Sequence, residues 1–319
     1  MGQIYVEGWA PDYGSPMQTD GALAEPEKVD EDVEVAGRWA PIVGVDDGVA
    51  EVVFVDGVRR VDARLTLDDP TDGPIAGLCG TYAVGAVGWD RRAGRSTYLP
   101  SRVARLALFG SGKVAEVPVA GPRLAYRSES VAETDPAALV QRFHGAMRKA
   151  EAALSEELVR SGRFVVADGP INDLSATEKV GFIKSHRAPY LSSERRAVVA
   201  RLATGQRTPL FLIGAGGAYP RYSWYFRLAD VPRGHAWSGI ARAEVSSRLD
   251  LATAKRVADR VAAVLPATAS QPHIEPRAPQ NLVPIAALER ELRRLMGDPA
   301  FIYRALREAI MRDRIGSGR

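Results

Sequence analysis

One short pattern occurs twice in the chain, and both copies end in residues that could bind a metal ion. VVFVDG spans residues 52–57 and FVVADG spans residues 164–169, so each apolar run closes with an aspartate and a glycine. If the two runs form neighbouring parallel strands, Asp56 and Asp168 emerge at one sheet edge, where open α/β sheets bind ligands. Paired carboxylates repel each other unless a cation or proton lies between them. The pattern therefore predicts a site for Mg²⁺ or a similar hard ion, of the two-ion kind that catalyses phosphodiester displacement.

The Asp-Gly dipeptide has a second interpretation, because it is also a frequent hairpin turn. The alternating run at 58–66 favours a hairpin that closes at Asp56-Gly57, whereas Asp168-Gly169 has no obvious hairpin partner and favours a ligand. A third acid is expected on the helix before Asp168. The candidates there are Glu151, Glu156 and Glu157, although an exposed helix charge is the default interpretation of each.

The elements that would position these acids follow from the apolar periodicity and the turn residues. Strands are expected at 51–56, 58–66 and 163–168, with several antiparallel strands between Gly73 and Gly121. Apolar residues at helical spacing predict a helix over 137–160. Further helices are expected at 191–203, 251–264, 284–296 and 299–313, and further strands at 209–213, 222–229 and 236–245. This order predicts an α/β or α+β fold with a mixed sheet and a helical C-terminus.

Composition and charge indicate the kind of partner and the cellular compartment to expect. The 319 residues carry a net charge of +3, but residues 1–50 hold eleven acids and two bases, so the remaining chain is strongly basic. Such a chain suits a polyanionic partner, and its acidic segment could dock on a basic surface of the same or another chain. A single cysteine, no basic leader and no long apolar run predict a cytoplasmic protein that does not enter a membrane.

Several common catalytic motifs fail in this sequence. FGSGKVAE lacks the first glycine and the final Ser or Thr of a phosphate-binding loop, and IGAGGAYP does not fit GxGxxG. GxSxG and HExxH are absent, which argues against a serine hydrolase and a zinc protease.

Five segments together resemble the NurA-type nucleases, in the order found in that family. They are FVDGVRR at 54–60, MRKAEAALSEELV at 147–159, FVVADGPI at 164–171, VGFIKSH at 180–186 and PRAPQNLVPIAALE at 276–289. The resemblance implies an RNase H-like mixed sheet over residues 51–319, with a β-rich insertion at about 70–125 behind the acidic segment 1–50. It also implies that Asp56, Glu151 and Asp168 bind Mn²⁺ or Mg²⁺.

Two positions depart from the family pattern. Val58 stands where the family has a serine, and the family's C-terminal histidine aligns near Ala286. His273 is the candidate to replace that histidine as a catalytic group, and Glu275 is the neighbouring alternative.

Basic residues near the two aspartates are the expected DNA contacts. They are Arg59 and Arg60, directly after Asp56, and Lys184 in VGFIKSH. By resemblance, the protein is a homodimeric DNA nuclease of low sequence specificity that processes DNA ends, in repair or antiviral defence, with a HerA-like hexameric ATPase. The alternatives are a degenerate RNase H-like adaptor that binds DNA or the ATPase without cutting, and an enzyme acting on RNA.

Overall fold

The computed structural model describes residues 27–121, 124–171, 175–184, 190–217 and 219–317, and these residues fall into two units. The first unit comprises the described residues of Met1–Phe54, Val87–Thr97 and Ser155–Ala286, and the second those of Val55–Ala86, Tyr98–Leu154 and Ala287–Arg319. Both contain strands and helices, the strands pair in both directions, and the chain ends in helices. The expected mixed α/β class is therefore confirmed.

The first unit is built on strands in the order β1-β11-β12-β13-β9-β8-β3. β12 and β13 are antiparallel, whereas β8 and β9 are parallel. Leu191, Val198, Phe211 and Tyr225 pack with Trp39 in its core. The elements of this unit are β1 (Val29–Asp30), β2 (Ile42–Val43), β8 (Val165–Asp168), β9 (Val180–Ile183), α2 (Ser193–Ala200), β10 (Gln206–Arg207), β11 (Phe211–Ile213), β12 (Arg221–Arg227), β13 (Ile240–Ser246), α3 (Leu251–Val264) and a 3-10 helix (Leu265–Thr268).

The described part of the acidic segment docks on the first unit of its own chain. β1 and β2 pair with β11 and β10. Glu34 forms a buried ion pair with Arg207 at 2.8 Å, and Asp47 pairs with Arg260 at 2.5 Å. Burial alone would lower the pKa of Arg207, but its two carboxylate partners outweigh this and raise the pKa. The first 26 residues of the segment lie outside the described residues.

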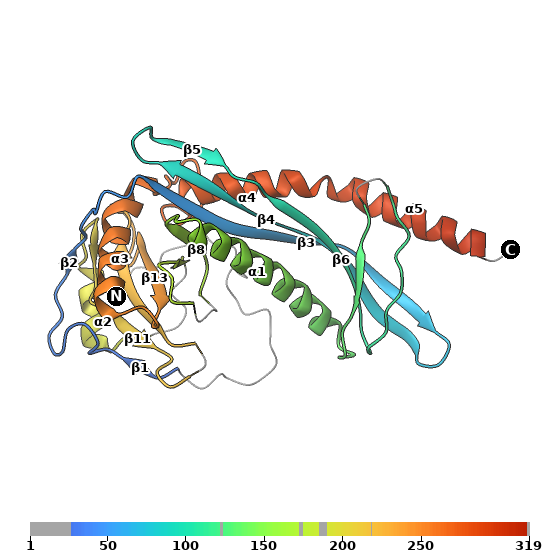
Figure 1. Cartoon of the computed structure of the whole chain (residues 1–319), viewed down its shortest axis with the longest axis horizontal. Coiled ribbons are helices and arrows are strands. Elements are labelled where there is room, and N and C mark those ends of the chain that lie inside the picture. The colour runs from blue at the N-terminus through green and yellow to red at the C-terminus, as the bar shows by residue number, and fades with distance from the viewer. Residues whose placement is uncertain (1–26, 122–123, 172–174, 185–189, 218, 318–319) are drawn as a thin grey trace. The chain divides into compact units, whose positions relative to one another are not determined.

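The second unit contains a long hairpin of β3 (Glu51–Asp69) and β4 (Gly73–Asp90), followed in the sheet by β6 (Arg102–Phe109) and β7 (Arg127–Ser130) (Figure 1). β4 and β6 are antiparallel, and β6 and β7 are parallel. The first residues of β3 and the last of β4 belong to the first unit, and β5 (Arg95–Tyr98) pairs with β4. β4, β5 and β6 occupy much of the expected β-rich stretch at 70–125.

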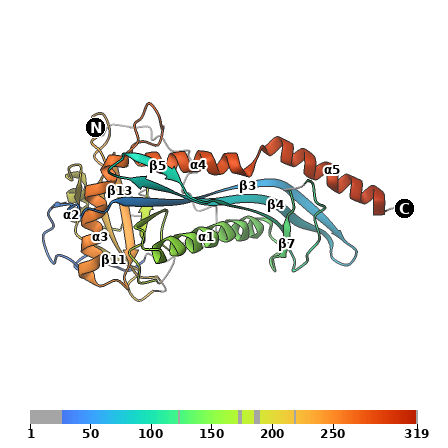
Figure 2. The same cartoon turned by 45° about the horizontal axis from the view of Figure 1, so that its top comes forward.

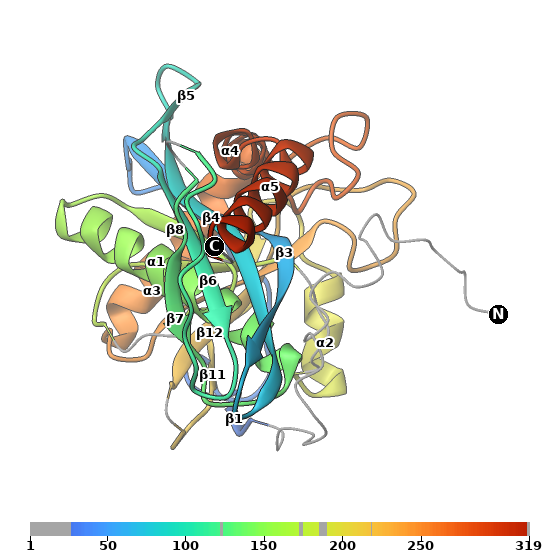
Figure 3. The ribbon, with the colours of Figure 1, turned by 90° about the vertical axis from the view of Figure 1, so that its right-hand side faces the viewer.

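Helices cover both faces of this hairpin sheet. α1 (Pro136–Arg160) lies on one face and α5 (Pro299–Ser317), after α4 (Val283–Met296), on the other (Figures 2 and 3). Alternate residues of β4 face opposite helices: a side chain at Gly80 would collide with Phe143 of α1, whereas Cys79 packs with Ile302 and Leu306 of α5. None of the helices in the described ranges is both long and apolar enough to cross a membrane.

One expected element is wrong. The hairpin predicted to close at Asp56-Gly57 does not exist, because β3 continues through this dipeptide for 19 residues. The turn lies instead at Pro70-Thr71-Asp72, where the Asp69 side chain accepts hydrogen bonds from the backbone N–H groups of Thr71 and Asp72. Pro-Thr-Asp-Gly combines the preset φ of proline with a glycine at positive φ, Gly73, so it is the stronger turn sequence.

Candidate metal centre

Asp56 is a buried carboxylate in the middle of β3, with 7% of the residue exposed. Its Oδ1 accepts a hydrogen bond of 2.7 Å from the backbone N–H of Gly57. Because side chains alternate along a strand, Asp56 and Gly57 face opposite sides of the sheet. A Cβ on Gly57 would meet Met147 and Glu151 of α1, so Asp56 faces away from α1.

Asp168 is the last residue of β8 and is held by a buried lysine. Lys184 Nζ donates to Asp168 Oδ2 at 2.5 Å and to Asn281 Oδ1 at 2.8 Å. The strand ends because Gly169 adopts a φ of +100°, a conformation that other residues rarely take. The following turn is fixed by Glu244, which is fully buried and accepts a hydrogen bond from the Ile171 N–H.

The first residues of β3 lie beside the start of β8 in the first unit. The Val53 N–H donates to the Phe164 carbonyl at 2.9 Å. Asp56 lies three residues beyond Val53, and Asp168 four residues beyond Phe164. β3 and β8 are hydrogen-bonded neighbours in the sheet.

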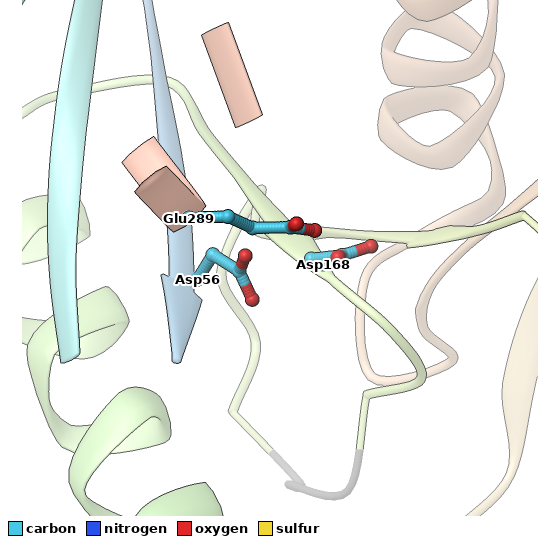
Figure 4. A group of neighbouring side chains, drawn as sticks. All are labelled: Asp56, Asp168 and Glu289. Carbon is cyan, nitrogen blue, oxygen red and sulfur yellow. The ribbon is translucent and has the colours of Figure 1, made fainter. Parts of the chain in front are cut away.

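Three carboxylates form a group that could hold a cation. Asp56, Asp168 and Glu289 each offer one oxygen, and these oxygens lie within 4.8 Å of one another (Figure 4). Carboxylate oxygens are the ligands that hard divalent cations such as Mg²⁺ and Ca²⁺ take in proteins. Oxygen ligands at this spacing fit a hard divalent cation, which would also relieve the repulsion among three acids.

Glu289 was not among the residues singled out in the sequence. It lies on α4 with only 6% of the residue exposed, in line with the buried Ile285, Leu292 and Met296. An acid inside the apolar stripe of a helix was the signal that could have identified it. Glu289 is also one helical turn beyond Ala286, where the family histidine aligns.

Glu151 and His273 are not members of this three-residue group. Glu151 Oε2 lies 3.3 Å from the position that a Cβ on Gly57 would take, on the α1 face of the second unit. His273 is exposed in a turn of the first unit. The neighbouring Glu275 is buried, accepts from Arg277 and Asn281, and has its pKa lowered to about 2, because these hydrogen bonds outweigh burial, which would raise it. The catalytic roles of Glu151 and His273 stay predictions.

The three predicted DNA contacts have different surroundings. Arg59 is half-buried, and this burial lowers its pKa. Arg60 donates to Asp62 at 2.8 Å and to the Gly297 carbonyl at 2.9 Å, so it holds β3 to the α4–α5 connection of its own unit. Lys184 is buried, with 4% of the residue exposed. Their contacts with DNA also stay predictions.

Comparisons with known proteins return nucleases among solved structures. The crystal structure of the NurA nuclease from Sulfolobus solfataricus is 13% identical, with a TM-score of 0.39 over 81% of this chain and 86% of that chain. The catalytic domain of human Endonuclease V is 15% identical, with a TM-score of 0.30 over 80% of this chain and 92% of that chain. No family model and no curated protein matches the chain.

Proposed function

We propose that this protein is a metal-dependent DNA nuclease of the NurA type, with an RNase H-like sheet. The observation that carries the proposal is the group of three carboxylate oxygens within 4.8 Å, from Asp56, Asp168 and Glu289. Asp56 and Asp168 are also the aspartates that the NurA resemblance selects. These three side chains would hold Mn²⁺ or Mg²⁺, which when bound supplies Lewis-acid stabilisation of the phosphate and an activated water.

Neighbouring residues would lower the repulsion among the three carboxylates and order Asp168 before this ion binds. Lys184 neutralises one of the three carboxylates, which lowers the repulsion that an empty acidic group would suffer. Glu244 and Gly169 fix the turn after Asp168, so that this carboxylate is ordered before the cation arrives. No base-reading motif is present in the sequence, so phosphate contacts would dominate DNA binding and make it weaken steeply with salt.

Cleavage of labelled linear DNA by the purified full chain in MnCl₂ tests the proposal. The wild type should cut DNA, and D56A and D168A should not, whereas E291A should cut normally because Glu291 is a surface acid of α4 paired with Arg294. Intact DNA with the wild type would contradict the enzyme and favour the non-cutting adaptor. A matched ribonucleotide substrate separates a DNA nuclease from an enzyme acting on RNA.

The assembly and the number of ions belong to the same proposal. The protein would act as a homodimer on a HerA-like hexameric ATPase that feeds it DNA, and light scattering with and without such an ATPase measures both associations. The two-ion mechanism stays a prediction, which counting the Mn²⁺ bound per chain would test.

A further inference from the structure

A chain of buried polar side chains leads from Asp168 into the first unit. Lys184 Nζ bridges Asp168 Oδ2 and Asn281 Oδ1 at 2.5 and 2.8 Å, and Asn281 Nδ2 donates to Glu275 Oε2 at 3.0 Å. Glu275 in turn accepts from Arg277 Nε at 2.9 Å. Asn281 is fully buried, and Lys184 and Glu275 are at most 8% exposed.

Glu275 determines which groups donate and which accept in this series of hydrogen bonds. Paired with Arg277, Glu275 stays charged down to a pH of about 2 and can only accept hydrogen bonds. The amide nitrogen of Asn281 must therefore face Glu275, which leaves its oxygen to face Lys184. A buried ammonium needs such acceptors, because an unpaired buried charge is costly.

We propose that Asn281 and Glu275 are positioning residues of the metal centre, which hold the Lys184 ammonium on Asp168 Oδ2 and so fix the orientation in which the Asp168 carboxylate is offered to the cation. This inference rests on the proposed function. It explains why a lysine that is 4% exposed follows β9: its amine acts through Asp168 instead of reaching DNA on the surface. Removing Asn281 would take away one acceptor of the ammonium, so that its position on the Asp168 carboxylate would shift and it would compete with the cation.

The test measures equilibrium Mn²⁺ binding to the full chain, by electron paramagnetic resonance without DNA. N281A should weaken Mn²⁺ binding roughly tenfold, as loss of a partner behind a metal ligand typically does. N281D should weaken it too, because a second carboxylate would lie against Glu275.

The double variant E275Q/N281D should restore binding to within about threefold of the wild type. It keeps the net charge and an oxygen acceptor for Lys184, and reverses the hydrogen bond between positions 275 and 281. A merely structural role for Asn281 would not produce this recovery. If N281A does not fold, the difference in Mn²⁺ affinity between N281D and E275Q/N281D tests the positioning role.

T268V is the matched control, because Thr268 is a buried hydroxyl of the same unit that donates to the Leu265 carbonyl. It should bind Mn²⁺ like the wild type. Folded Asn281 variants with wild-type Mn²⁺ affinity would overturn the positioning role while leaving the metal centre intact. Loss of the metal centre itself would appear differently, as a wild type that binds no Mn²⁺ or a D168A variant that binds it unchanged.

Discussion

The two Asp-Gly dipeptides have nearly the same sequence surroundings and opposite structural roles. Asp56-Gly57 lies in the middle of β3, and Gly57 is not among the glycines with positive φ. Asp168-Gly169 ends β8, with Gly169 at a φ of +100°. At the first site a Cβ would only crowd the flexible side chains of Met147 and Glu151 on α1, whereas at the second glycine is needed for the backbone conformation.

The two aspartates differ in what they pair with. Asp168 shares its charge with the buried Lys184, whereas Asp56 Oδ1 accepts from a neutral backbone N–H. The comparison teaches that one carboxylate is charge-compensated and fixed before a cation binds.

The largest expected effect separates these two carboxylates by stability. D168A should lower the free energy of unfolding by about 3–5 kcal/mol, because it leaves the buried Lys184 ammonium without its carboxylate. D56A should lower the free energy of unfolding by clearly less in EDTA, since it leaves the buried Lys184–Asp168 ion pair in place. Urea unfolding in EDTA measures both, and equal losses would contradict the comparison.

A further test concerns Glu289, the third carboxylate of the group with Asp56 and Asp168. E289Q should weaken Mn²⁺ binding by more than about tenfold, because it replaces a carboxylate of the group by a neutral amide. Calorimetric titration measures this change. E291Q, two residues along the same helix, should bind Mn²⁺ like the wild type, and equal loss in both variants would point to helix damage.

The two glycines can be compared directly. G169A should destabilise the protein by about 1–2 kcal/mol, since alanine is strained at positive φ even though no atom lies within 4 Å of the added Cβ. G57A should change stability by less than about 1 kcal/mol, because the flexible side chains of Met147 and Glu151 can move by a few tenths of an ångström. Thermal unfolding measures both, and a larger loss in G57A would refute the assignment of roles.

The last prediction concerns the pH dependence of stability and His144 on α1, the helix that Gly57 faces. Burial, helped by the charges of Arg59 and Arg148, lowers the pKa of His144 to about 4 from its ordinary value near 6.5. The unfolded chain therefore binds more protons between these values, so stability is complete above pH 6.5 and falls as the pH drops towards 4. H144Q should flatten this slope in unfolding experiments across that range. A wild-type slope in H144Q would contradict this pH dependence.

Local patterns predicted the elements well where short-range chemistry decides them. The helix expected at 251–264 is α3, residue for residue, because its apolar face is regular and Asp250 caps its start. The hairpin at Asp56-Gly57 was wrong because a dipeptide alone does not reveal that a stronger turn follows at 70–72. Asp56 and Asp168 could be singled out from their strands. Glu289 could be noticed only as an acid within the apolar stripe of its helix, and Asn281 carries no such signal, because its partner Lys184 lies far away in the sequence.

A crystal grown or soaked in MnCl₂, with anomalous scattering recorded at the manganese edge, tests the central claim most directly. The account predicts a manganese peak bound by carboxylate oxygens of Asp56, Asp168 and Glu289, with Lys184 still on the remaining oxygen of Asp168. Absence of manganese density among these carboxylates at saturating concentration, or an ion bound elsewhere while they stay apart, would contradict it.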